Sequence, residues 1–244
     1  MEGGCLCGAV RFRLDPPLRD VIACHCTQCR KTSGHLWAAT SVPLAAFHLT
    51  QVAGLRWFQS SAQARRGFCG DCGASLFWEL AGEGRISVAA GALEGATGLS
   101  IGADWFLEDA GDYYHGPTKA PETLTGSCLC GANHFTLPGP MGAVTACHCR
   151  QCRKLSGHFA ASFDVEEAAL IWQAKALAEF TTPGGGLRGF CGTCGSSLYF
   201  RAKDGAFSVA AGVIDNPTGG HLTSHVFSAD KGDYYPLTDG LPQR

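Results

Sequence analysis

The sequence predicts an all-β protein built from two tandem copies of one domain. All 14 cysteines fall into two sets of seven, which recur in the same order and at nearly the same spacings. Short apolar runs bounded by glycine are numerous, and the 33 glycines favour short strands joined by tight turns. Helical patterns are scarce. Only Val165 to Ala178, rich in alanine and glutamate, permits a helical turn.

Individual strands are predicted from short apolar runs. Between Ala9 and Leu14, apolar residues alternate with Arg11 and Arg13, which is the period of a half-buried strand. Other apolar runs predict further strands in the first half and counterparts in the second: Val21 to Cys24, Leu36 to Val42, Ser75 to Leu80 and Ile86 to Ala90, then His134 to Leu137, Val144 to Cys147, Phe159 to Phe163, Ser196 to Phe200 and Phe207 to Ala211.

The repeat divides the 244 residues into two domains, which we place at residues 1–120 and 121–244. Each is long enough to bury a core of its own. The break is expected between Tyr114 and Leu124, where the segment 115–122 has two prolines and no hydrophobic periodicity. Two such copies can pack on each other as an intramolecular pseudo-dimer.

Composition and charge exclude several classes of partner. The formal net charge is −2 and no basic run exceeds a pair, so we expect no nucleic-acid partner. No apolar stretch approaches the ~18 residues of a membrane span, so we expect no membrane partner. The first motif begins at Gly3, which leaves no room for a secretory leader. We therefore expect a cytoplasmic protein, in which paired cysteines favour metal binding over disulfides.

In each copy a Cys-x-Cys pair and a distant Cys-x-x-Cys pair can supply four sulfurs to one ion. Four thiolates around a tetrahedral zinc form a closed structural site that ties an early hairpin to a late one. The alternative is that these cysteines are reduced and simply buried in the core. The predicted zinc ligands are Cys5, Cys7, Cys69 and Cys72 in the first copy, and Cys128, Cys130, Cys191 and Cys194 in the second.

The remaining cysteines form a three-sulfur motif in each copy: Cys24, Cys26 and Cys29, then Cys147, Cys149 and Cys152. Three protein ligands and one open position are typical of a catalytic zinc, which can bind a substrate thiolate. Alternatively, His35 and His158 close the shells and both sites are structural. A redox Cys-x-x-Cys is disfavoured because no βαβ pattern surrounds it.

Two other features of the sequence allow more than one interpretation. Arg30-Lys31 and Arg153-Lys154 follow the last sulfur of each three-cysteine motif, where they either offset thiolate charge, bind a substrate carboxylate, or face solvent. The aromatic residues are interpreted as core rather than as a substrate platform: Trp37, Trp57, Phe58, Phe77 and Trp78.

Three motifs, each present twice, carry a resemblance to a known family. They are Gly-x-Cys-x-Cys-Gly, Cys-His-Cys-x-x-Cys-Arg-Lys-x-Ser-Gly and Gly-Phe-Cys-Gly-x-Cys-Gly-x-x-Leu. In this order they resemble the family of glutathione-dependent formaldehyde-activating enzyme and centromere protein V. The resemblance implies a zinc-bound Mss4-like, or β-tent, fold. It also implies one structural zinc, one substrate-facing zinc and a carbon-sulfur lyase activity on a thiol adduct, typified by glutathione joined to formaldehyde.

The leading hypothesis is therefore an enzyme that acts on a small-molecule thiol or thiol adduct, with His35, His158 or His225 moving the proton. Its rival is a binding or scaffold module in which every zinc is structural. The second copy has His225-Val226-Phe227 before its Gly-Asp-Tyr-Tyr segment, resembling a His-Ile-Phe element of the family, whereas the first has Asp104 at the matching place. Because a neutral imidazole can relay a proton near pH 7, we expect activity mainly in the second copy.

Overall fold

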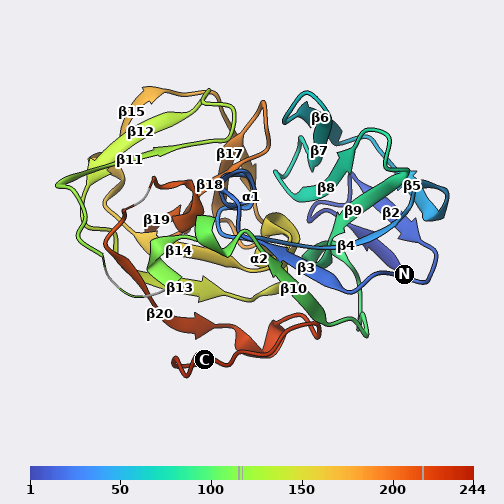
Figure 1. The fold of residues 1–244 in the computed structure, drawn as a ribbon. Helices are drawn as coiled ribbons and strands as arrows, with labels where there is room; N and C mark the ends of the chain where they lie inside the picture. Colours follow the sequence, from blue (N-terminus) through green and yellow to red (C-terminus); the bar gives the residue numbers. More distant parts are fainter. Residues whose placement is uncertain (115, 117, 216) are drawn as a thin grey trace.

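Each half of the chain folds into one three-stranded and one seven-stranded sheet in this computed structural model, which describes residues 1–114, 116, 118–215 and 217–244. Figure 1 shows the two halves side by side, the first in blue to teal and the second in yellow to red. The prediction of an all-β fold with two similar units is confirmed. Of the expected connecting segment, His115 and Pro117 lie outside the described residues.

In the first half, the small sheet has the order β1-β2-β5 and the large sheet the order β10-β3-β4-β9-β8-β7-β6. Within the large sheet β10 runs parallel to β3, and its other described pairs are antiparallel. The elements are β1 Glu2–Gly4, β2 Arg11–Leu14, β3 Val21–Cys24, α1 Thr27–Ser33, β4 Trp37–Pro43, β5 Phe47–Gln51, β6 Leu55–Gln59, β7 Ala64–Cys69, β8 Ser75–Leu80, β9 Arg85–Ala89 and β10 Ile101–Trp105.

The second half repeats this topology, with sheets β11-β12-β15 and β16-β17-β18-β19-β14-β13-β20 and a parallel β13–β20 pair. Its elements are β11 Thr123–Ser127, β12 His134–Pro138, β13 Gly142–Cys147, α2 Arg150–Ser156, β14 Ala160–Asp164, β15 Ile171–Ala174, β16 Leu177–Thr181, β17 Leu187–Cys191, β18 Ser197–Arg201, β19 Phe207–Ala210 and β20 Gly220–Val226.

Each half has a hydrophobic core formed mainly by its own strands, and a third cluster of buried residues combines side chains of both halves. Alternation along the strands directs side chains into these cores. In β2 the side chains of Phe12 and Leu14 are fully buried while Arg11 and Arg13 face solvent, as the period of two predicts. The segment Val165 to Ala178 forms one 3₁₀ turn, Glu167–Ala169, and otherwise contributes to strands β15 and β16. The helical signal there accounts for one turn only.

The two short helices, absent from the sequence prediction, begin within the three-cysteine motifs, so that the last cysteine of each motif lies in the first helical turn. The Cys26 sulfur accepts a hydrogen bond from the backbone N–H of Cys29, which caps the start of α1, and Gly34 in the left-handed conformation ends it. Cys149 and Gly157 do the same for α2. Within the described residues, neither α-helix is long or apolar enough to cross a membrane.

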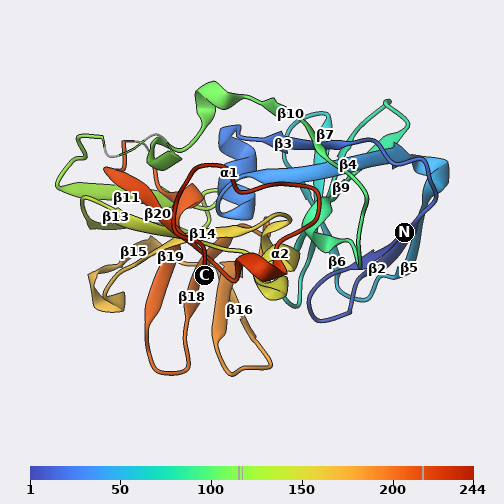
Figure 2. The ribbon, with the colours of Figure 1, turned by 90° about the horizontal axis from the view of Figure 1, so that it is seen from below.

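The helices lie at the centre of the molecule, between the halves (Figures 1 and 2). The two halves are also joined by a matching pair of aspartate–threonine contacts. Asp112 accepts hydrogen bonds from the backbone N–H and the hydroxyl of Thr218, while Asp233 accepts the equivalent pair from Thr97. Each Gly-Asp-Tyr-Tyr segment therefore ties its own half to the other.

The backbones of the two halves are in direct contact at Gly91. Its N–H donates to the carbonyl of Gly157 at 2.8 Å, and an added Cβ would lie 2.4 Å from the backbone oxygen of Arg153. We expect Gly91→Ala to lower the free energy of unfolding by about 2–4 kcal/mol, because backbone must move to admit a methyl group. Denaturant unfolding measures this. The control is Gly184→Ala, where a Cβ meets nothing within 4 Å; an equal effect of both changes would contradict the prediction.

Candidate metal centres and their pockets

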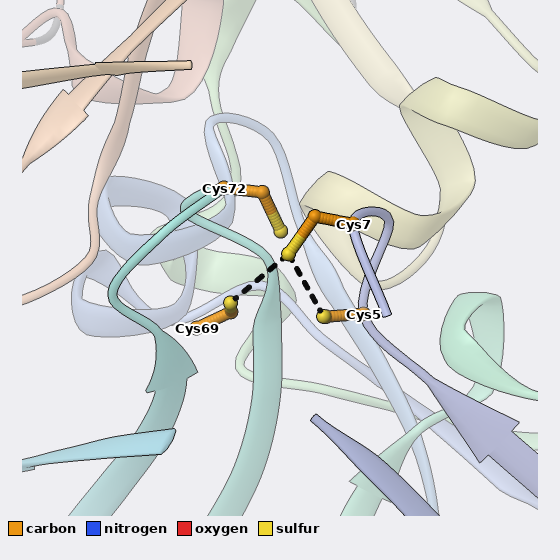
Figure 3. Close-up of side chains that lie close together, drawn as sticks. All are labelled: Cys5, Cys7, Cys69 and Cys72. Carbon is orange, nitrogen blue, oxygen red and sulfur yellow. Dashed lines mark hydrogen bonds between the residues drawn. The ribbon is translucent and has the colours of Figure 1, made fainter. Parts of the chain in front are cut away.

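Four sulfurs converge in each half, from the turn after the first strand and from the β7–β8 or β17–β18 turn. Figure 3 shows this group in the first half, where the Cys7 sulfur lies 3.5 Å from that of Cys5 and 3.7 Å from that of Cys69. The matching separations in the second half, from Cys130 to Cys128 and Cys191, are 3.6 and 3.7 Å. All four ligand atoms in each group lie within 4.8 Å of one another.

These separations fit a tetrahedral zinc. With Zn–S bonds of about 2.3 Å, sulfurs at tetrahedral corners stand about 3.8 Å apart. The pKa of Cys5 is lowered to about 2 because the thiols of Cys69 and Cys72 donate to its sulfur, whereas the same contacts raise the pKa of Cys72. Hydrogen bonds from its neighbours therefore favour the thiolate form of Cys5. Four thiolates this close together would repel one another, and a dication would offset that repulsion.

Three further sulfurs meet at the start of each helix. Cys24 ends β3, Cys26 caps α1 and Cys29 lies in its first turn, and their sulfurs lie within 4.8 Å of one another. The pKa of Cys26 is lowered to about 2 by hydrogen bonds from Cys24 and Cys29. Cys147, Cys149 and Cys152 form the same group. In the part of the chain that the structure describes, no histidine or carboxylate joins either group.

Each three-sulfur group opens onto a pocket of about 540 Å³. The first pocket is lined by the three-sulfur group of the first half together with Trp37, Trp78 and Trp105. The second is lined by the sulfurs of the second half and by Ser33 and Gly34, which come from the end of α1 in the first half. The four-sulfur groups, in contrast, line neither pocket. The two kinds of cluster thus differ in whether they line one of these two pockets.

Residues 1–109 and 123–230 match the family described as glutathione-dependent formaldehyde-activating enzyme. The chain belongs to this family. An uncharacterized lyase of Schizosaccharomyces pombe is 28% identical over 120 residues, which are 46% of this chain and 82% of the relative. A Rhodobacter sphaeroides protein of known crystal structure is 26% identical, with a TM-score of 0.37, and the match covers 43% of this chain and 99% of that one.

The formaldehyde-activating enzyme family is a zinc-binding family, and the sulfur geometry of this member suits zinc at all four groups. The structure gathers the cysteines into the groups that their spacing predicts. That they bind metal, and which metal, stays a prediction.

The three histidines predicted to act in catalysis are all buried and line neither pocket. His35 Nδ1 lies 2.8 Å from the hydroxyl of Tyr113, and His158 Nδ1 lies 2.9 Å from that of Tyr234. Burial lowers the pKa of both histidines well below its ordinary value, so both rings are neutral at pH 7. Neither ring belongs to a three-sulfur group.

His225 belongs to a series of hydrogen bonds that includes His148, the residue between Cys147 and Cys149 in the sequence. Its Nε2 lies 2.8 Å from Asp239, its Nδ1 lies 2.8 Å from His148 Nε2, and His148 Nδ1 lies 2.7 Å from the hydroxyl of Tyr235. Burial and the neighbouring His225 lower the pKa of His148 to about 4, so this ring is neutral at pH 7. One set of tautomers satisfies every contact. Tyr235 donates to His148, which donates to His225, which donates to Asp239.

The first half has a shorter version of this series of hydrogen bonds. His25 Nε2 donates directly to Asp104 at 3.0 Å, and His25 Nδ1 has no hydrogen-bond partner among the described residues. The histidine between the first two sulfurs of the motif is therefore held at one nitrogen in the first half and at both in the second.

Two arginines beside the sulfurs were missed by the sequence analysis. Arg66 Nη2 lies 3.5 Å from the sulfur of Cys29, and Arg188 Nη2 lies 3.4 Å from that of Cys152. If the three-sulfur groups hold a dication, each guanidinium would offset part of the excess negative charge of the three thiolates. The available signal was the repeated Arg-Gly-Phe-Cys motif, in which the arginine lies two positions before a buried phenylalanine on the same strand.

The lysines of the Arg-Lys pairs serve the interface between the halves. Lys31 donates to Asp215 at 2.8 Å and to Ser127 at 2.6 Å, while Lys154 pairs with Glu94 at 2.7 Å. Both ammonium groups thus reach the opposite half. These contacts differ from the functions considered from the sequence, which were to offset thiolate charge, to bind a substrate carboxylate or simply to face solvent.

Proposed function

We propose that the chain is a zinc-dependent lyase that makes or breaks the carbon–sulfur bond of a thiol adduct, such as glutathione joined to formaldehyde or a related aldehyde. The observation that carries the proposal is the three-sulfur group at a pocket, with no fourth ligand among the described residues. Membership of the formaldehyde-activating enzyme family and the lyase name of the yeast relative support the choice of reaction.

The cysteines of the three-sulfur groups would hold the metal, which when bound supplies a positive centre that keeps a substrate sulfur as thiolate. In the forward direction the sulfur bonds to the carbonyl carbon, and the thiol proton passes to the former carbonyl oxygen. The reverse reaction returns that proton to sulfur. Arg66 and Arg188 limit the negative charge at the sulfurs, and the pocket walls exclude bulk water from the adduct.

We also propose that His225 acts as a positioning residue in this reaction. Its bond to Asp239 fixes its tautomer, and its Nδ1 then fixes the ring of His148, which lies between Cys147 and Cys149 in the chain. The first half lacks the intervening imidazole. This difference supports assigning most of the turnover to the second half.

Metal analysis gives the first test. We expect four zinc ions per chain, two retained against a mild chelator and two removed by it, because the three-sulfur groups are open to the pockets and the four-sulfur groups are not. Elemental analysis before and after chelation measures both classes. A full complement of only two ions would leave the scaffold hypothesis in place of the lyase.

Thiol binding and the reaction are tested on the protein prepared with cobalt in place of zinc. Adding glutathione should change the visible spectrum, because a substrate thiolate completes the coordination of the three-sulfur site. Exchange between free formaldehyde and its glutathione adduct, followed by NMR, should be faster with the protein than without it. An unchanged spectrum together with an unchanged exchange rate contradicts the proposal.

A further inference from the structure

The two pockets differ most at the ends farthest from their sulfurs. In the first pocket, Arg19 and Arg85 approach strand β4 at neighbouring positions. Arg19 Nη2 donates to the carbonyl of Ala39 at 3.1 Å, while Arg85 donates through Nη2 and Nε to the carbonyl and hydroxyl of Ser41 at 3.0 and 3.2 Å. A guanidinium has five N–H donors, so each arginine retains donors that these contacts do not use.

Among the described residues no carboxylate contacts this pair of charges directly, although the Asp20 carboxylate nearby acts to raise the pKa of Arg19. Neither Arg19 nor Arg85 forms a salt bridge with any described residue. Burial and the neighbouring charge of Arg85 lower the pKa of Arg19, so the two guanidinium groups lie within range of mutual repulsion. Arg66 adds a third positive charge to the lining, against the single acid Glu83. An anion placed between the guanidiniums would relieve the repulsion.

The walls between this end and the sulfurs are flat and apolar. Three of the five tryptophans in the chain line the first pocket: Trp37, Trp78 and Trp105. The indole Nε1 of Trp37 is buried without a hydrogen-bond partner among the described residues. Trp37 pairs with Cys24 in the sheet, and Ala39 and Ser41 lie two and four residues further along β4. The arginine contacts therefore lie about 7–13 Å from the sulfur end of the strand.

The second half lacks this combination. At the places of Trp37 and Trp78 it has Ala160 and Phe200, and at the place of Arg85 it has Ala206. Where Ser41 accepts from Arg85 in the first half, the second half has an acid, Asp164. At these places the second half offers an anion no arginine, and the arginines that line the second pocket, Arg150 and Arg188, belong to its sulfur end.

We propose that the first pocket binds an elongated aromatic carboxylate, its ring between the tryptophans and its carboxylate on Arg19 and Arg85, and that the second pocket does not. If the proposed lyase function holds, the substrates of the first half are thiols and thiol adducts that carry such an aryl carboxylate group. The anion site itself does not depend on that reaction.

Three related probes separate the anion site from thiol binding. They are 3-phenylpropanoate, which lacks a thiol, 3-(4-mercaptophenyl)propanoate, which has both groups, and 3-(4-mercaptophenyl)propan-1-ol, which lacks the charge. Described residues lining the second pocket include no tryptophan, so tryptophan emission reports occupancy of the first pocket. The zinc-loaded full chain is titrated with each probe, by emission for 3-phenylpropanoate and by calorimetry for the two thiols.

We expect 3-phenylpropanoate to quench tryptophan emission, and Arg85→Gln to weaken its binding and that of the carboxylated thiol by about 10- to 100-fold, the range for a charge-assisted hydrogen bond. The glutamine keeps a donor for Ser41. Binding of the uncharged thiol should change by less than about twofold. The control is Arg13→Gln, which removes an exposed arginine outside the pocket.

Unchanged emission, or an affinity for 3-phenylpropanoate that Arg85→Gln leaves intact, would overturn the proposal. An equal loss for the charged and uncharged thiols would overturn it too, because it would mean that the variant disturbs the pocket as a whole. If 3-phenylpropanoate binds through Arg85 but the thiol group adds no affinity, the anion site stands and the lyase assignment fails.

Discussion

Replacing Cys72 by serine is expected to unfold the first half of the chain, whereas replacing Cys26 is expected to leave it folded. Cys72 belongs to the closed four-sulfur group and is 1% exposed. Zinc at such a group contributes on the order of 10–16 kcal/mol of binding free energy that is coupled to folding, against a total domain stability of about 5–15 kcal/mol. Losing one of four ligands removes enough of this to unfold the half.

Far-ultraviolet circular dichroism and zinc content, measured on the same samples, check this result. Cys72→Ser should lose the signal of one half and its zinc. Cys26→Ser should keep the fold with a smaller loss of stability, because Cys26 lies at the accessible group and at the start of a helix of only two turns. If both variants lose the same stability, the three-sulfur groups are structural and the scaffold hypothesis gains support.

The strands were predictable because burial on one face leaves a period of two in the sequence. Val21 to Cys24 forms a strand with this alternating burial at the predicted residues. Ser75 to Leu80 also forms a strand where it was predicted, but from an apolar run whose burial does not alternate. The outer hairpin of β6 and β7 was missed. Within it Leu55–Gln59 is only partly buried on either face, so its apolar residues do not alternate cleanly. Its hydrogen bonds to β7 decide its structure, and these depend on contacts distant in sequence.

The helices were missed for a different reason. Seven residues are too few to show a hydrophobic period, and cysteine is not among the usual capping residues. The sulfur of Cys26 nevertheless caps α1, and Gly34 ends it. A glycine following Arg-Lys-x-Ser was the available signal, since glycine is common where a helix ends in the left-handed conformation.

The grouping of the sulfurs could be predicted from the spacing of the cysteines, but the pockets could not. Close Cys-x-Cys and Cys-x-x-Cys pairs limit where a metal can be held. Whether an aromatic side chain lines a pocket depends on the residues packed around it in the fold, which the sequence pattern does not reveal. Phe77 and Trp37 belong to the hydrophobic core and Trp78 packs against it, as interpreted from the sequence, but both tryptophans also line the first pocket. Arg66 likewise acquires its role from the fold, which brings β7 beside the start of α1.

Cys149→Ser is expected to remove most of the turnover of the glutathione–formaldehyde adduct, by more than about 100-fold, whereas Cys26→Ser should leave most of it. The physical reason is the difference between the hydrogen-bonded chains. His148 is held at both nitrogens by Tyr235 and His225, while its counterpart His25 has a hydrogen-bond partner among the described residues at one nitrogen. The basic, tryptophan-lined first pocket also suits a larger and more aromatic molecule than this adduct. Steady-state kinetics of the two single variants measures the contrast.

His225→Ala distinguishes positioning from mere structural support. We expect kcat to fall by about 10- to 100-fold with KM changed by less than about twofold, because the substrate pocket is intact while His148 loses its hydrogen-bond acceptor. Zinc content and the unfolding midpoint should stay close to those of the unaltered chain if the effect is catalytic. Asp104→Ala, the matching change in the first half, serves as the control and should leave turnover of this adduct nearly unchanged. If Cys26→Ser and Asp104→Ala abolish turnover instead, the first half is the active one and the histidine chain of the second half is structural.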